Sequence, residues 1–187
     1  MCGILLTNFQ HVTCNSFNKA LKLMSHRGPD YEDSVEINGL FMGHNRLSVI
    51  DLDNRSNQPF SKDKLHIIYN GELYNFKDLK KRFKLDVTTA SDTEVVLLMY
   101  RKFGSKCLKY FNGMFAFAIY DENTGDIFVA RDRLGIKPLY YNTNGKNLLF
   151  SSEIAPMLEI SPENFDDFGL RQYRKLRMTV KNYTVYN

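Results

Sequence analysis

The stretch Met114-Phe115-Ala116-Phe117-Ala118-Ile119-Tyr120 decides the fold, together with residues 126–131, which follow it after a short polar segment. The two runs are predicted to form a β-hairpin. Alternate side chains of a strand point to opposite faces, and both faces of the first strand are apolar. One face carries Met114, Ala116 and Ala118, and the other carries Phe115, Phe117 and Ile119. A strand wetted on one side would alternate polar and apolar residues, so this strand is predicted to be covered on both faces.

Hydrophobic spacing predicts the remaining elements around this hairpin. Strands are expected at residues 3–9, 34–37, 40–44, 65–69, 139–142 and 148–151, and helices at residues 16–25, 75–83, 91–103 and 165–175. Ser91 and Glu94 have the spacing of a capping box at the start of the third helix, and Gly104 ends that helix. Mostly antiparallel strands with helices outside predict an α+β fold, a four-layer αββα sandwich of two stacked sheets.

The composition is that of an ordinary globular domain. The chain has 187 residues, 43% hydrophobic and 25% charged, enough for one domain with a substantial core. Its net charge of +4 is mild and spread along the chain, so neither nucleic acid nor a membrane is expected as a partner. Three cysteines without a CxxC pair argue against a disulfide framework or a zinc site. We expect a cytoplasmic protein, because the apolar run around Cys2 is also too short for a signal peptide.

The last stretch, residues 161–187, differs from the rest. It is basic, carries the fourth predicted helix, and stops at residues 183–187 inside a predicted strand. One interpretation is a frayed terminus with a solvated, charged face. The interpretation that we favour is a longer natural chain cut at this point, because a strand does not usually end a domain without a partner. Residues 1–160 are thus expected to form one domain, and residues 161–187 the start of a connection to another.

Cys2 is the first candidate for chemistry. A residue as small as cysteine at position 2 normally allows removal of the initiator methionine, which would leave Cys2 with a free α-amine beside its thiol. An α-amine titrates near about 7.7–8.0 and a thiol near about 8.5, so one residue would hold both a base and a nucleophile. The alternative interpretation is that Cys2 is an ordinary small apolar residue at the start of a strand.

Cleavage of an amide by a thiolate also needs donors for the oxyanion and groups that recognise the substrate. The side-chain amide of Asn70 and the backbone N–H of Gly71 can point at one oxygen, although Asn-Gly is also a strong turn signal. Arg46 offers a planar fork for a carboxylate, or an ion pair with a surface acid such as Asp51. Asp92 is a candidate for binding an ammonium, or an acid that favours the start of its helix through the dipole.

Seven motifs follow one another along the chain. They are Met1-Cys2-Gly3-Ile4, His26-Arg27-Gly28-Pro29-Asp30, His44-Asn45-Arg46-Leu47-Ser48-Val49-Ile50-Asp51, Asn70-Gly71-Glu72-Leu73-Tyr74-Asn75, Ser91-Asp92-Thr93-Glu94, Asn112-Gly113-Met114-Phe115-Ala116-Phe117-Ala118 and Arg131-Asp132-Arg133-Leu134-Gly135-Ile136-Lys137-Pro138-Leu139-Tyr140-Tyr141. In this order they closely resemble the glutaminase domain of glutamine-hydrolysing asparagine synthetases, which are class II glutamine amidotransferases with an N-terminal nucleophile. The resemblance covers about residues 1–158 and implies an Ntn-hydrolase type of sandwich, in agreement with the doubly apolar hairpin.

The resemblance implies a reaction and a role for each candidate residue. The exposed Cys2 would attack the side-chain amide of L-glutamine and form a thioester, which water converts to glutamate while ammonia is released. The implied catalytic residues are Cys2, Asn70 and Gly71, the last two as the oxyanion hole. The implied glutamine-binding residues are Arg46 at the α-carboxylate, Asp92 at the α-ammonium, and Val49, Ile50 and Glu72 around the rest of the pocket.

The resemblance also implies partners. Ammonia would pass to a C-terminal synthetase domain or partner subunit that uses ATP and Mg, whereas no cofactor and no metal are expected in the glutaminase domain itself. The oligomeric state stays open, a homodimer included. Two alternatives also remain: a free-standing subunit that supplies ammonia, and a non-catalytic module that binds glutamine or a partner. An intact Met1 would favour the non-catalytic module, because an acylated amine cannot act as the base.

Overall fold

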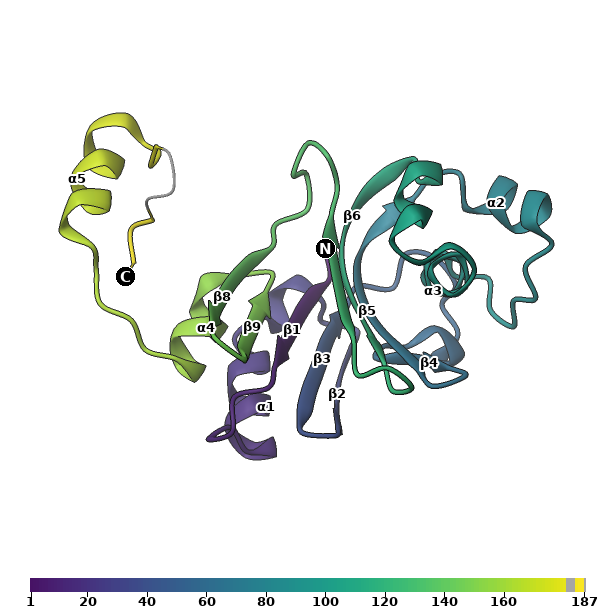
Figure 1. Cartoon of the computed structure of the whole chain (residues 1–187), viewed down its shortest axis with the longest axis horizontal. Coiled ribbons are helices and arrows are strands. Elements are labelled where there is room, and N and C mark those ends of the chain that lie inside the picture. The colour runs from purple at the N-terminus through teal and green to yellow at the C-terminus, as the bar shows by residue number, and fades with distance from the viewer. Residues whose placement is uncertain (181–183, 187) are drawn as a thin grey trace.

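Two β-sheets lie face to face between layers of helices (Figure 1). The computed structural model describes residues 1–180 and 184–186. The first sheet has the strand order β2-β3-β1-β9-β8, with β1 Gly3–Thr7, β2 Tyr31–Ile37, β3 Leu40–Arg46, β8 Tyr140–Asn144 and β9 Asn147–Ser151. The second has the order β4-β5-β6-β7, with β4 Phe60–Lys62, β5 Leu65–Leu73, β6 Gly113–Asp121 and β7 Ile127–Arg131. Neighbouring strands pair antiparallel, which confirms the predicted αββα sandwich.

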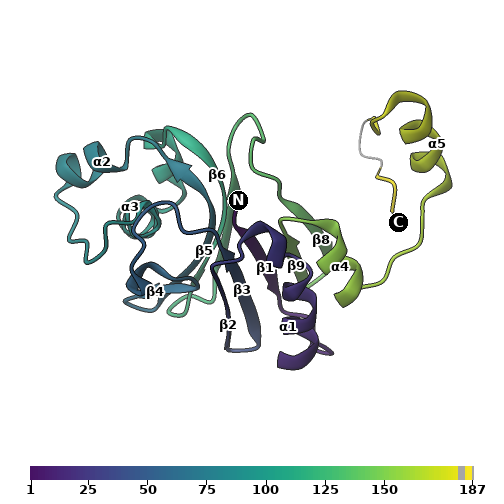
Figure 2. The same ribbon diagram turned by 180° about the vertical axis from the view of Figure 1, so that it is seen from behind.

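Helices cover the outer face of each sheet (Figures 1 and 2). The first sheet carries α1 Cys14–Lys22 and α4 Ile154–Ile160, and the second carries α2 Phe76–Phe83 and α3 Asp92–Phe103. Short 3-10 helices are η1 Ser25–Arg27, η2 Asn54–Ser56 and η3 Gly104–Tyr110. The short elements β4 and α4 were not predicted from the sequence. No helix in the described part of the chain is long and apolar enough to cross a membrane.

Strand β6 separates two apolar layers, as its sequence predicts. Ala116 and Ala118 lie between the two sheets, in a cluster that includes Ile4 of β1. Phe115 and Phe117 point the other way, into the cluster beneath α2 and α3. A further cluster lies between the first sheet and its helices. The small side chains on the inner face of β6 let the sheets approach each other, and the large ones fill the space under the helices.

Several strand boundaries differ from the prediction by a few residues, and the difference at β5 bears on the site. The strand expected to end at Tyr69 continues as β5 to Leu73, so Asn70 and Gly71 lie inside a strand and pair with Ala116 and Phe115 of β6. The interpretation of Asn70-Gly71 as a turn is therefore wrong. A Cβ on Gly71 would lie 2.6 Å from the Met114 carbonyl oxygen, so glycine is required here by the close approach of β6.

The predicted capping box at α3 is wrong in its second half. The Ser91 hydroxyl accepts a hydrogen bond from Thr93 N, as a cap should. The Glu94 carboxylate, fully buried, instead accepts bonds from Thr88 N and Thr89 N and pairs with the Lys62 ammonium at 2.8 Å. Glu94 thereby fixes the segment that enters α3, on which Asp92 is the first residue.

The C-terminal segment stands apart from the sandwich in both views (Figures 1 and 2). Helix α5, Asp167–Leu176, confirms the predicted fourth helix. Tyr186 forms an isolated antiparallel bridge with Phe165, and their rings stack with centroids 5.1 Å apart. Of the strand predicted at residues 183–187, the described residues show only this bridge, and residues 183 and 187 lie outside the described part.

Candidate active site

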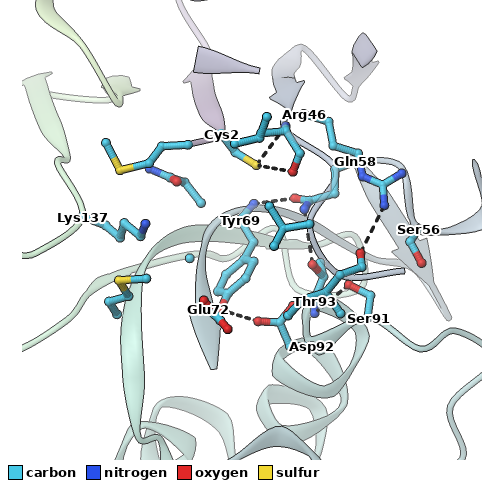
Figure 3. A pocket seen from close by; sticks show the side chains of 17 residues that line it. Cys2, Arg46, Ser56, Gln58, Tyr69, Glu72, Ser91, Asp92, Thr93 and Lys137 are labelled. Atoms are coloured by element: carbon cyan, nitrogen blue, oxygen red, sulfur yellow. Dashed lines mark hydrogen bonds between the residues drawn. The ribbon is translucent and has the colours of Figure 1, made fainter. Parts of the chain in front are cut away.

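A pocket of about 200 Å³ opens where the two sheets meet the start of α3 (Figure 3). All eight residues that the sequence assigned to a site line it: Cys2, Arg46, Val49, Ile50, Asn70, Gly71, Glu72 and Asp92. Cys2 lies just before β1, and the others come from β3, the segment after β3, β5 and α3, which are distant from it in sequence. The structure therefore brings the whole predicted set together, and the geometry below says what each residue can do there.

Cys2 precedes β1 and is held by backbone groups. Its Sγ accepts a hydrogen bond from Leu47 N at 3.4 Å and donates to Leu47 O at 3.8 Å. Burial raises the pKa of the thiol, although the Leu47 backbone and the positive charges of the chain terminus, Lys137 and Arg46 oppose that rise. The neutral thiol is thus favoured, and forming a thiolate calls for a base beside it.

Arg27 positions the backbone of Cys2, a role that sequence reasoning missed. Its Nε donates to the Cys2 carbonyl oxygen at 2.9 Å, and its Nη1 donates to Glu153 Oε1 at 2.9 Å. Gly28, the next residue, packs so closely that a Cβ would lie 2.3 Å from the Asn45 carbonyl. The signal that could have identified Arg27 was its place in the motif of residues 26–30.

Asn70 presents a buried donor without a partner. The residue is 1% exposed, and its Nδ2 makes no hydrogen bond. A buried N–H without an acceptor costs about 1–3 kcal/mol. Because Asn70 also lines the pocket, its side-chain amide is a donor that a bound oxygen can satisfy.

The N–H of Gly71 faces the same space. Tyr69 N donates to Gln58 Oε1 at 2.6 Å and Leu73 N donates to Asp92 Oδ2 at 2.8 Å, so both point away from β6. Alternate N–H groups of a strand point the same way, which places the Gly71 N–H at this edge too. Strand β4 pairs only with residues 65–67 of β5, so none of the described strands covers the edge at Gly71.

Arg46 differs from its expected geometry. Its guanidinium donates to protein acceptors through both Nη atoms: Nη1 to Asp53 O at 3.2 Å and Asn57 Oδ1 at 2.5 Å, and Nη2 to Ile50 O at 3.4 Å and to Asp51 O. The alternative of an ion pair with the Asp51 carboxylate is wrong, because that carboxylate accepts instead from Ser56 Oγ. A carboxylate gripped by both Nη atoms would have to displace these loop carbonyls.

Asp92 is a buried acid with its own hydrogen bonds. Its Oδ2 accepts from the Tyr69 hydroxyl and from Leu73 N, each at 2.8 Å. Burial raises the pKa of Asp92 and the neighbouring Glu72 adds to the rise, while the two bonds oppose it. Gln58 extends this network by donating to Thr93 Oγ1 at 3.2 Å. A cation bound beside Asp92 and Glu72 would relieve the cost of the buried charge.

Lys137 is the pocket residue that sequence reasoning missed most plainly. It is 6% exposed and lines the pocket, to which it comes from the loop after β7. Its backbone N donates to Asp132 Oδ2 at 3.0 Å. Besides the chain terminus, the pocket thus holds two side-chain cations, Arg46 and Lys137, and two acids, Glu72 and Asp92. Such a mixture complements a zwitterionic ligand.

Two histidines and the other two cysteines do not line the pocket. His26 contacts Glu153 at 2.9 Å, and His44 contacts Tyr69 O at 3.2 Å with its pKa lowered to about 3 by burial. Cys107 packs in the core, whereas Cys14 is exposed. None of the three cysteines is paired in a disulfide. Within the described residues, no group of three or more His, Cys, Asp or Glu could hold a metal ion.

Comparison with known proteins gives consistent relatives. A family model of the glutamine amidotransferase domain matches residues 1–187. A putative glutamine-hydrolysing asparagine synthetase of Methanocaldococcus jannaschii is 37% identical, over 100% of this chain and 41% of the relative. Asparagine synthetase B of Escherichia coli is 35% identical, over 74% of this chain and 26% of the relative. The chain thus spans less than half the length of these relatives.

A solved structure supports the fold. The glutamine phosphoribosylpyrophosphate amidotransferase from B. subtilis superposes with a TM-score of 0.70 at 22% identity, over 83% of this chain and 43% of that one. At this identity the likeness establishes the architecture and leaves the chemistry to the residues of the pocket.

Proposed function

The chain belongs to the glutamine amidotransferase domain family, and from that premise we propose that its pocket hydrolyses the side-chain amide of L-glutamine through a thioester on Cys2. One observation carries the proposal: the buried Asn70 Nδ2 has no partner in a pocket that also contains a cysteine. An unpaired donor of this kind is costly in the free protein and is repaid when an oxyanion forms.

The nucleophile requires removal of Met1. While Met1 is attached, the Cys2 nitrogen is an amide and cannot accept a proton, and the Met1 side chain occupies part of the pocket wall. Once Met1 is removed, the α-amine of Cys2 accepts the thiol proton, and the thiolate attacks the side-chain carbonyl carbon of glutamine. The raised pKa of the thiol makes this internal base necessary.

The oxyanion then lies between Asn70 Nδ2–H and the Gly71 N–H. The protonated α-amine gives its proton to the leaving nitrogen, ammonia departs, and a thioester remains on Cys2. Water attacks the thioester while the same amine takes a proton from it, and the tetrahedral intermediate collapses to glutamate and the free thiol. The same two donors serve both steps, because the developing charge falls on the same oxygen.

Glutamine binding uses the charged residues of the pocket. The α-ammonium lies against Asp92 and Glu72, and the α-carboxylate against Arg46, with Val49 and Ile50 around it. Because the Arg46 fork is held by carbonyls of residues 50–53, binding exchanges those contacts for the carboxylate of glutamine. The observed network of Arg46 therefore makes loop adjustment a part of substrate binding.

Ammonia release from glutamine by Cys2→Ala tests the proposal. The purified chain is first weighed intact, and loss of one methionine residue is expected. Cys2→Ala should then release no ammonia above background, whereas the matched control Cys14→Ser, at an exposed cysteine, should keep the wild-type rate. Hydrolysis by Cys2→Ala at the wild-type rate would refute the nucleophile. Retention of Met1 on all native material would favour the non-catalytic binding module instead.

The fate of the ammonia completes the proposal. Residues 1–160 form the amidotransferase domain, residues 161–187 begin the connection to a synthetase domain or partner subunit, and that partner uses ATP and Mg to amidate aspartate or a related carboxylate. This assignment is supported by the two relatives described above, both of which are named as glutamine-hydrolysing asparagine synthetases. The thioester chemistry itself uses only side chains and the α-amine, and a thiol nucleophile suits the reducing cytoplasm. Size measurement in solution decides between a monomer and a homodimer.

A further inference from the structure

Lys137 is a buried cation without an acidic partner. The residue is 6% exposed, and the salt bridges found in the described residues all involve other side chains. Burying an ammonium without a counter-charge is unfavourable, so a protein that keeps one gains from a negative charge that comes and goes. The pocket is where such a charge would have to arise.

The loop that carries Lys137 is rigidly organised. The Asp132 carboxylate accepts hydrogen bonds from the backbone N–H groups of Phe115, Leu134, Ile136 and Lys137, at 3.2, 3.2, 2.9 and 3.0 Å. Arg131 Nε also donates to the Lys137 carbonyl at 2.7 Å. Figure 3 shows the Lys137 side chain reaching into the pocket from the side opposite Ser56. Its ammonium is therefore held in the pocket by the backbone and is not drawn there by a neighbouring acid.

The charges around the thiol can be named element by element. Lys137 comes from the loop after β7, Arg46 from β3, the titratable Tyr69 and Glu72 from β5, and Asp92 from α3, and the N-terminal ammonium of Met1 lies before β1. Arg46 uses its Nη atoms on loop acceptors, and Asp92 and Glu72 carry the opposite sign. Of the two side-chain cations of the pocket, Lys137 is thus the one whose ammonium forms no hydrogen bond or ion pair among the described residues, and it stays in the pocket when Met1 is removed. Its charge opposes the effect of burial on the Cys2 thiol.

We propose that the Lys137 ammonium stabilises the thiolate of Cys2. Lys137 thereby acts as a positioning residue, because it holds the negative charge on the sulfur until the attack on glutamine. When the thiol proton passes to the α-amine, negative charge appears on Sγ, and Lys137 is placed to balance it until the charge moves onto the glutamine oxygen. The inference rests on the proposed function for the role of the thiolate, but the effect of Lys137 on the pKa of the Cys2 thiol can be measured without it.

The experiment measures that property directly. The rate at which iodoacetamide alkylates Cys2 is followed from pH 6 to 10 by mass spectrometry of the N-terminal chymotryptic peptide, which ends at or before Phe9, so Cys14 and Cys107 do not interfere. In Lys137→Met the titration midpoint should rise by about one pH unit, which lowers the alkylation rate near pH 7.5 about tenfold. Lys137→Arg should restore the wild-type midpoint. Lys106→Met is the matched control, because it removes one exposed positive charge outside the pocket.

The outcomes separate the inference from the proposed function. An unchanged midpoint in folded Lys137→Met, equal to that of Lys106→Met, would overturn the role of Lys137, and Lys137→Gln supplies a second neutral variant if the first does not fold. In ammonia release, Lys137→Met should lower kcat, shift the acidic limb of the pH profile upward and leave KM for glutamine within about twofold. Should Cys2→Ala keep full hydrolysis, the proposed function fails, and the alkylation result stands independently.

Discussion

The two walls of the pocket differ in how their polar groups are partnered. On one wall, which we call the recognition wall and define as Arg46, Gln58 and Asp92, the side chains are already engaged with the protein. The other, the reaction wall, is defined as Cys2, Asn70, Gly71 and Lys137; within the described residues Asn70 Nδ2 lacks a partner and Lys137 forms no salt bridge. The first wall is shaped before the ligand arrives.

The difference indicates which step each wall serves. Groups that are satisfied in the free protein can define a shape and a charge pattern, and they favour ground-state binding. Donors that are unsatisfied in the free protein gain most when charge develops, and they favour the transition state. Substitutions on the reaction wall should therefore change kcat, and substitutions on the recognition wall should change KM or stability.

Asn70→Ala should give the largest effect among these tests. Removing one oxyanion donor is expected to lower kcat about 100- to 1,000-fold. The melting temperature should not fall, because Nδ2 has no protein partner to lose and an unpaired buried donor is itself unfavourable. Steady-state ammonia release and thermal unfolding measure the two quantities. A kcat within about twofold of wild type would contradict the oxyanion assignment.

Asn75→Ala is the matched control for that variant. Asn75 donates to Tyr110 O at 2.9 Å and accepts from Asn112 N at 3.1 Å, outside the pocket. Its loss should cost about 1–3 kcal/mol of stability and leave kcat unchanged. The same side chain thus stabilises the fold at one position and is predicted to serve the reaction at another.

Asp92→Asn should weaken the binding of glutamine and increase the stability of the fold. Loss of the charge facing the ammonium is expected to raise KM about 10- to 100-fold, the value of a charged hydrogen bond. Since burial raises the folded pKa of Asp92, its contribution to stability is full below the ordinary pKa of 3.8 and falls as the pH rises through the raised value. At neutral pH the neutral amide should therefore raise the melting temperature. A lower melting temperature would show that the bonds to Tyr69 and Leu73 outweigh the desolvation of the charge.

Asp132→Asn tests the support of the reaction wall. Burial alone would raise the pKa of Asp132, but the backbone N–H groups of the loop lower it overall, so the ionised form stabilises the fold. Replacing it by an amide should cost about 1–3 kcal/mol in denaturant unfolding and loosen Lys137. Asp126→Asn, at an exposed position, should cost less than about 0.5 kcal/mol. Equal costs for the two variants would contradict this account of the loop.

The smallest expected effect concerns Glu153. Burial opposes ionisation, yet the bonds from Arg27 and His26 lower the pKa of Glu153 below 4.5. A lowered folded pKa stabilises the chain above pH 4.5, and that stability is lost as the pH falls through the lowered value. Glu153→Gln should therefore flatten the pH dependence of stability below about pH 5 by less than about 1 kcal/mol. An unaltered acid profile would show that this ion pair is fully screened.

Sequence patterns predicted the fold more completely than they predicted the geometry of the site. The doubly apolar run of β6 predicts both the stacking of the sheets and the helical covers, because periodicity reports burial directly. The position of Asn70 could not be read this way, since Asn-Gly favours a turn locally, and only pairing with β6 keeps it extended. The engagement of Arg46 by a neighbouring loop depends on tertiary contacts that no local pattern encodes, and so does the placing of Lys137 in the pocket without a salt bridge to another described residue.

The packing of β6 has a consequence beyond stability. Cys2 immediately precedes β1 of one sheet, and Asn70 and Gly71 belong to β5 of the other, so the nucleophile and the oxyanion donors are attached to different sheets. Stacked sheets lie about 10 Å apart, and here the side chains of Ala116 and Ala118 form part of the spacer. The packing of this apolar layer thus sets the distance between the attacking sulfur and the oxyanion donors. A single methyl group added to the layer would move the sulfur out of alignment with those donors.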